Sequence, residues 1–203
     1  MPALVSPVTG LWIAPKEIEW RKIDITGENE NPFTAQQQVY PWNTAWLEAS
    51  LSWVLTNPQF QLMDAWLDSL QGIAGVFPFG DPVNIAPIHP GATAPSVNGA
   101  NQSGFTLNVS GGGYQSVGDF ISIPGPSSYN GLNYSAGSRL YRVTSVSSGV
   151  LGVWPNLREP PTSGQLISIA TCQGTFRLKK NDRQAMQRTD KSWSLTYEVR
   201  EAI

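Results

Sequence analysis

Residues that carry chemistry are scarce in this sequence of 203 residues. It holds one cysteine, Cys172, and one histidine, His89. A single cysteine excludes a disulfide within the chain, so packing alone must hold the fold together. One cysteine and one histidine cannot supply the usual ligands of a zinc site, and no G-x-S-x-G nucleophile motif is present. We therefore expect no catalytic residue, no metal site and no cofactor, in a protein that is not an enzyme.

Charge is also scarce. Charged residues make up 14% of the sequence and the formal net charge is -2, whereas soluble domains usually carry about 25% charged residues. The near-neutral balance argues against specific nucleic-acid binding, which needs a basic face. No stretch approaches the roughly 18 apolar residues of a membrane span, and residues 1–17 lack the features of a signal peptide. We expect a protein that is folded in a cytoplasm and has no membrane partner.

Sixteen prolines and nineteen glycines favour many short strands over long helices. Residues 17–25 and 45–55 are predicted strands, and residues 45–55 alternate cleanly between apolar and polar positions. Residues 26–43 are polar and have no clear period, which indicates either a surface loop or an arm that reaches a neighbouring subunit. Residues 75–82 are predicted to form a short strand and a turn, and further strands are predicted near 104–110, 119–124, 139–147, 149–157, 164–170, 174–180 and 192–203.

One helix is predicted, over residues 58–71, in this otherwise β sequence. Asn57 is the expected N-cap, Pro58 fits the first turn and Gly72 is the expected stop. An apolar stripe that includes Met63 and Leu67 needs a sheet face to cover. Asp64 and Asp68 lie one turn apart, which is typical of a solvated helix face rather than of a glycosidase acid pair.

The strand pattern predicts two domains. Five short strands between residues 104 and 170 suit a small closed barrel of the OB or SH3-like kind. The last two strands cannot fold alone, so they need the strands at 17–25 and 45–55. We expect a discontinuous β domain made of residues 1–92 and 171–203, with residues 93–170 inserted as the barrel and residues 83–103 as a linker.

Several residues are candidates for a subunit interface. Four tryptophans lie in a part of the chain that a core barely needs, and they are either core residues or interface anchors. Basic residues near the last hairpin, between 177 and 191, form either a solvated turn or a contact with acidic groups of a neighbouring subunit. The candidates are Trp12, Trp20, Trp42 and Trp46, the acidic Glu28 and Glu30, and the basic Lys179, Lys180 and Arg183.

The order of these features resembles a known family. The run "LEASLSWVL" leads into "QFQLMDAWLDSLQGIAGVFPF", then "SVGDFISIP", "RLYRVTSVSSG", "LGVWPNLREPPTSG", "GTFRLKKND" and "SWSLTYEVREAI". Over residues 45–203 the chain resembles distal tail proteins of long-tailed, siphovirus-type bacteriophages, of the type with one inserted OB-like domain. The resemblance implies a tail-tube-like β-sandwich or barrel with one packed helix, plus the inserted barrel.

The resemblance also implies a role in the virion. Such proteins form a homohexameric ring in the baseplate at the end of the tail tube. The ring joins the tail tube protein to the tail hub protein and to fibres or receptor-binding proteins used in host attachment. No reaction and no cofactor belongs to this family, and the protein would be made in the host cytoplasm.

Three other functions stay open at this point. A carbohydrate-binding adhesin module would stack sugars on exposed aromatic residues such as Tyr129, Tyr134 and Trp154. A tail-completion or connector protein would share the barrel folds of the distal tail. A cell-wall hydrolase would need a catalytic set that the sequence lacks.

Overall fold

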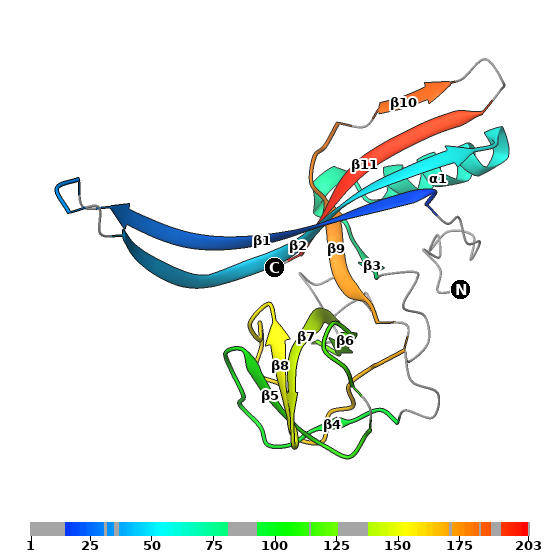
Figure 1. The fold of residues 1–203 in the computed structure, drawn as a ribbon. Helices are drawn as coiled ribbons and strands as arrows, with labels where there is room; N and C mark the ends of the chain where they lie inside the picture. The colour runs from blue at the N-terminus through cyan, green and yellow to red at the C-terminus, as the bar shows by residue number, and fades with distance from the viewer. Residues whose placement is uncertain are drawn as a thin grey trace.

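The structure is a computed structural model that describes residues 15–30, 32–34, 37–80, 93–113, 115–125, 138–170, 172–182, 184–187 and 192–202. It is mainly β, with 52% of residues in strands, one helix longer than a single turn among the described residues, and two sheets. Figure 1 shows the two sheets joined at the middle of the molecule, with one long hairpin projecting away from both. The fold class expected from the sequence is therefore confirmed at this coarse level.

The larger sheet has six strands in the order β1-β2-β11-β9-β3, with β10 also paired to β11. Its strands are β1 (Glu17–Glu30), β2 (Gln37–Leu55), β3 (Val76–Phe79), β9 (Gly174–Leu178), β10 (Gln184–Gln187) and β11 (Trp193–Glu201). All pairs are antiparallel, and β11 lies in register with β2 so that Leu195 faces Trp53. The sheet thus joins the first strands of the chain to the last.

The alternation predicted for residues 45–55 is confirmed in β2. Leu47, Leu51 and Trp53 are buried, whereas Ser50 and Ser52 are partly exposed on the opposite face. The buried face carries the main core, to which Trp20 contributes by stacking on Phe79 with ring centroids 5.2 Å apart.

The single long helix, α1 (Asn57–Ser69), covers this buried face. Met63, Trp66 and Leu67 are buried there, as the apolar stripe predicts. The predicted N-cap was wrong by one residue, because Thr56 is the cap and its backbone N–H donates to Gln59 Oε1 at 3.0 Å. Asn57 instead accepts a hydrogen bond from the indole of Trp193.

The end of the helix also differs slightly from the prediction. Helix α1 ends at Ser69, and a 3-10 turn, η1 (Gly72–Ala74), follows it. Gly72 has a φ of 70°, and a Cβ there would lie 2.4 Å from Asn181 Oδ1. Glycine is therefore needed at this position both for its backbone conformation and for the close approach of the β9–β10 connection.

The smaller sheet has five strands in the order β4-β5-β8-β7-β6. They are β4 (Ser96–Val97), β5 (Thr106–Ser110), β6 (Phe120–Ile123), β7 (Arg139–Ser147) and β8 (Val150–Trp154). The sheet curls into a half-barrel around its own core, which includes Leu107, Ile121 and Ile167. Two predictions were wrong here: β4 lies inside the expected linker, and residues 164–170 form no strand.

Residues 165–168 instead connect the two edges of the curled sheet. Leu166 bridges to Ser96 on β4, and Ser168 bridges to Ser122 on β6. Single bridges of this kind satisfy the backbone groups of both edges without a continuous ladder. Edge protection by such a segment has the same effect as closure of a small barrel.

The loop predicted for residues 26–43 was partly wrong. Strands β1 and β2 stay paired out to Glu30 and Gln37, so most of this segment is a β-hairpin. In Figure 1 the hairpin extends far beyond both sheets. Within the described residues, no helix is long and apolar enough to cross a membrane.

Candidate docking site

The outer part of the β1–β2 hairpin is separated from the sheet by a bulge. Ile25 pairs with Thr44 but Thr26 pairs with Pro41, so the register shifts between these two pairs. A bulge bends a hairpin, and proline is tolerated in strands at such irregular positions because it has no N–H to donate. We call the described residues beyond the bulge, 26–30, 32–34 and 37–44, the arm.

The arm exposes large apolar side chains. Phe33 at its tip is 95% exposed, Trp42 is 66% exposed, and Val39 and Tyr40 are also exposed. The indole of Trp42 lies over Gly27, where an added Cβ would be 3.0 Å from Trp42 Nε1. The absence of a Cβ at Gly27 thus leaves room for this close approach of the ring to the backbone of the arm. Aromatic side chains presented in this way are typical of interface anchors.

The charge of the arm is of one sign. Glu28 and Glu30 are the only charged residues between Thr26 and Thr44. Glu28 accepts a hydrogen bond from the side-chain amide of Gln37 across the hairpin. The arm therefore presents an acidic and aromatic surface.

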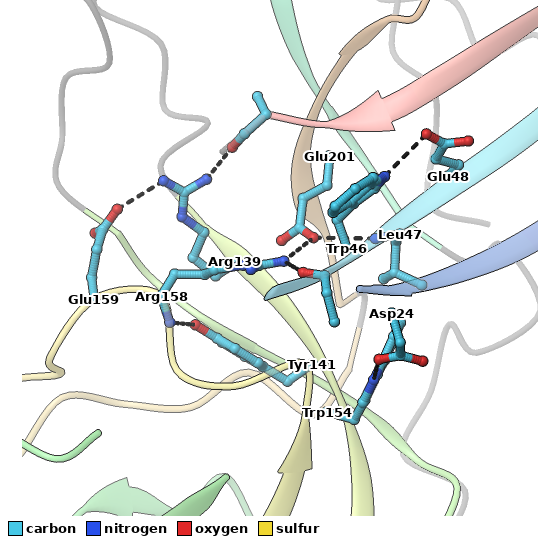
Figure 2. Close-up of polar contacts among 12 residues, drawn as sticks. Asp24, Trp46, Leu47, Glu48, Arg139, Tyr141, Trp154, Arg158, Glu159 and Glu201 are labelled. Atoms are coloured by element: carbon cyan, nitrogen blue, oxygen red, sulfur yellow. Dashed lines mark hydrogen bonds and ion pairs between the residues drawn. The ribbon is translucent and has the colours of Figure 1, made fainter. Parts of the chain in front are cut away.

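The base of the arm is attached to the smaller sheet (Figure 2). The indole N–H of Trp154, at the end of β8, donates to Asp24 Oδ1 at 2.7 Å. The ammonium of Lys22 lies 5.5 Å from the centroid of the Trp154 ring, a cation–π distance. Burial, followed by the nearby charge of Arg142, lowers the pKa of Lys22. Trp154 is therefore occupied by contacts within the chain rather than presented to a sugar.

A buried ion pair also joins the two sheets. Arg158 and Glu201 are 3.0 Å apart, with 8% and 1% of their side chains exposed. Arg158 also donates to the Ala45 carbonyl, and Glu201 accepts the backbone N–H of Leu47. Burial raises the pKa of Glu201, against the opposing effect of Arg158. Figure 2 shows these groups converging between β2, β11 and the chain after β8.

A second arginine makes a parallel contact. Arg139 of β7 donates to the Ala202 carbonyl and forms a 2.7 Å ion pair with Glu159. The last residues of the six-stranded sheet are thus held by two arginines of the other half of the molecule. Sequence reasoning missed these contacts, since partners such as Arg158 and Ala45 are 113 residues apart and no local pattern marks them.

The basic residues of the last hairpin find partners other than Glu28 and Glu30 within the chain. Lys179 lies 2.7 Å from Glu48 and 3.6 Å from Glu198. Lys180 lies 3.9 Å from Glu198, and 65% of its side chain is exposed. Arg183 and Trp12 lie outside the described residues, as do Tyr129, Tyr134 and His89.

The Glu48–Lys179 pair gives a pH-dependent contribution to stability. Burial acts to raise the pKa of Glu48, but hydrogen bonds from Lys179 and Trp46 outweigh it and the pKa is lowered. A carboxylate whose folded pKa is depressed stabilises the fold above its unfolded pKa and loses this contribution as the pH falls. Trp46 is part of this cluster, because Arg200 stacks 4.2 Å from its ring centroid.

We therefore expect wild type to gain stability over Glu48→Gln as the pH rises through about 3 to 5, near the unfolded glutamate pKa. The gain should be modest, about 1 kcal/mol or less, because Lys179 is partly exposed. Urea unfolding of both proteins over this pH series measures the difference. If the stability difference between wild type and Glu48→Gln shrank as the pH rises, the lowered pKa assigned to Glu48 would be wrong.

A groove lies on the face of the six-stranded sheet opposite α1. It has a volume of about 780 Å³, and its lining includes Ser50, Lys180, Asp182, Met186, Thr196 and Glu198. Strand β10 forms one wall, where Met186 is 68% exposed. Hydroxyl groups of β2 and β11 line the floor.

No family model and no curated protein matches this chain.

The exposed side chains of the arm and the groove could contact another molecule. Among the described residues, no group of three or more histidine, cysteine or acidic side chains could hold a metal ion. Cys172 is buried, and burial raises the pKa of its thiol to about 12, so it is a poor nucleophile. The arm belongs to β1 and β2, whereas the groove is lined mainly by residues of β10 and β11 and of the chain between β9 and β10.

Proposed function

We propose that this protein is a virion structural protein, the ring-forming subunit at the distal end of a siphovirus-type phage tail. In this role it joins the tail tube to the hub and to receptor-binding parts. The observation that carries the proposal is the arm, a long hairpin that extends beyond both sheets and exposes aromatic side chains such as Trp42. The sequence resemblance described above supplies the place in the virion.

The energetics of the arm support a function in assembly. An isolated two-stranded hairpin is marginally stable in water, and ordering each residue costs about 1–2 kcal/mol of backbone entropy. The arm has no second layer beneath it, since its described side chains are exposed or only partly covered. Contact with another molecule would cover Phe33 and Trp42 and would offset this cost.

The edges of the six-stranded sheet support the same function. Strand β1 has 14 residues and, among the described strands, pairs with β2 alone, so no described strand covers its other edge. Charged side chains along it, such as Glu19 and Arg21, are typical protection against uncontrolled pairing. A closed ring needs heterologous contacts, in which two different surfaces of one subunit meet those of its neighbours, and an arm and a distant groove are two such surfaces.

The finer fold assignment belongs to this proposal. We infer that residues 1–92 and 171–203 form a tail-tube-like domain and that residues 93–170 form an inserted OB-like barrel. The separate core of the five-stranded sheet supports this division, and so does its curled shape, with residues 165–168 between its edges. The inserted barrel would be the platform for fibres or receptor-binding proteins.

Native mass spectrometry and negative-stain electron microscopy test the proposed ring. We expect hexamers with a central hole, in equilibrium with monomers at low concentration. A chain that stays monomeric at every concentration, and also with the tail tube and hub proteins of the same phage present, would overturn the proposal.

Removal of the arm is expected to abolish assembly. The variant replaces residues 26–43 with Asn-Gly, which closes a tight two-residue turn between the paired residues Ile25 and Thr44. The truncated protein should stay folded and monomeric, because none of the described residues of the arm belongs to either core. Circular dichroism and urea unfolding check the fold, and native mass checks the assembly. Hexamers formed without the arm would contradict its assigned function.

A further inference from the structure

We propose that the bulge at the base of the arm is a hinge, and that Trp42 is a latch that holds the arm at one angle to the larger sheet. The inference assigns a conformational function to the contact between Trp42 and Gly27. It does not depend on which molecule the arm contacts, so it can be tested separately from the proposed ring.

The bulge adds two residues to one strand only. Because Ile25 pairs with Thr44 and Thr26 pairs with Pro41, residues 42 and 43 of β2 have no counterpart on β1 in the register. The ladder between the two strands is therefore interrupted at this point, and a bulge is where a strand pair bends. Protein hinges commonly consist of a few such residues, which absorb a change in backbone angles.

The sheet side of the bulge is fixed to the rest of the chain. Asp24 accepts a 2.7 Å hydrogen bond from the indole of Trp154 (Figure 2). The carbonyl of Ala45 accepts a hydrogen bond from Arg158, and Ala45 is only 4% exposed. Asp24 and Ala45 lie next to the bulge on β1 and β2, so the fixed part of the hairpin ends at the bulge.

The arm side of the bulge lacks this support. None of the described residues of the arm belongs to either hydrophobic core. The ring of Trp42 does pack there, because a Cβ at Gly27 would lie 3.0 Å from Trp42 Nε1 and 3.3 Å from Trp42 Cε2. Trp42 comes from the bulge itself, whereas Gly27 is a paired residue of the arm. The contact therefore ties the arm to the hinge.

The latch is built so that it can open. Trp42 is 66% exposed, so its ring gains only a small area of burial from the contact with Gly27. A partner that buries the whole indole would gain more and would draw the ring away from Gly27. Docking at Trp42 would then shift the arm toward other angles, because the partner binds the open state better.

Distances between two spin labels across the bulge test the hinge in the full chain. Val39→Cys in the arm and Val54→Cys in the sheet are labelled together, since these positions are 57% and 43% exposed and Cys172 is buried. Pulsed electron–electron double resonance gives the distance distribution, at a dilution where native mass spectrometry detects monomers. We expect a narrow distribution for this parent protein, and a broader one with a shifted maximum after Trp42→Ala.

Gly27→Val tests the same contact with Trp42 still present. The added side chain displaces the indole from its place over Gly27. Valine favours strands more than glycine does, so loss of the latch predicts a broader distribution, whereas a local effect on strand stability predicts a narrower one. Phe33→Ala is the matched control for Trp42→Ala, because Phe33 is an exposed aromatic residue at the tip of the arm. It should leave the distribution unchanged.

Three results would overturn the inference. A distribution that is already broad in the parent would exclude the latch, and an unchanged distribution in either Trp42→Ala or Gly27→Val would show that the contact does not set the angle. Faster hydrogen exchange of the arm amides in Trp42→Ala would show that Trp42 holds the two strands together instead. Broadening in both variants with unchanged exchange supports the hinge, whether or not the protein forms hexamers.

Discussion

Glu201→Ala is expected to lower the free energy of unfolding by about 3–5 kcal/mol, the usual cost of breaking a buried ion pair from one side. Arg158 would remain 92% covered without a carboxylate 3.0 Å away, with only the Ala45 carbonyl to accept from its guanidinium. The backbone N–H of Leu47 would lose its acceptor as well. The loss falls at the junction of the two sheets, so the variant should also weaken the attachment of the five-stranded sheet.

Urea unfolding followed by tryptophan fluorescence measures this loss. Glu19→Ala is the control, because Glu19 forms an exposed 3.4 Å pair with Arg21, and such pairs contribute about 0–1 kcal/mol. The double variant Arg158→Met with Glu201→Leu removes both charges and should regain most of the stability. Equal destabilisation by Glu201→Ala and Glu19→Ala would show that the buried pair does not hold the junction.

The parts of the fold that were predictable are those with one face buried. In β2 and β11, burial on one side forces apolar residues to alternate with polar ones, as at Leu51 and Ser52, and the pattern can be read directly. The apolar stripe of α1 follows from the same cause at the helical period. The exact cap did not follow from residue type, because Thr56 and Asn57 are both good cap residues. In the structure the contact of Thr56 with Gln59 and that of Asn57 with Trp193 separate them.

The arm could not be recognised as a hairpin because neither of its faces is buried. Without a core side, residues 26–30 and 37–40 have no reason to alternate, and the sequence shows no period there. The bulge at Ile25 and Thr26 adds a register shift that further hides the pairing. Polar residues and a proline at a bulge, such as Pro41, are features that protect exposed strands against unwanted pairing.

The candidate interface residues separate in space in a way that the sequence could not indicate. Trp20 packs within the core and Trp46 lies beneath Arg200, so both have partners in the chain. Trp42 is the one of the three described tryptophans of this set that is mostly exposed. The sequence does not show which of these tryptophans is exposed, because the side of the hairpin on which each one lies depends on the register of β1 and β2 across the bulge.

Trp66→Ala is expected to destabilise the fold by about 3–5 kcal/mol, the usual range for removal of a large buried aromatic side chain. Trp66 is 2% exposed and packs edge-on against Phe77, with ring centroids 5.2 Å apart, so its loss opens a cavity between α1 and the sheet. Trp66→Phe should cost much less, because the indole N–H has no hydrogen-bond partner to lose among the described residues and the ring contact is kept. Thermal and urea unfolding measure both changes, with Gln61→Ala, at an exposed position of the helix, as the control.

If Trp66→Ala behaved like Gln61→Ala, the helix would not be a structural cover for the sheet. Since the arm and the groove lie away from α1, the folded fraction of Trp66→Phe should still assemble like wild type.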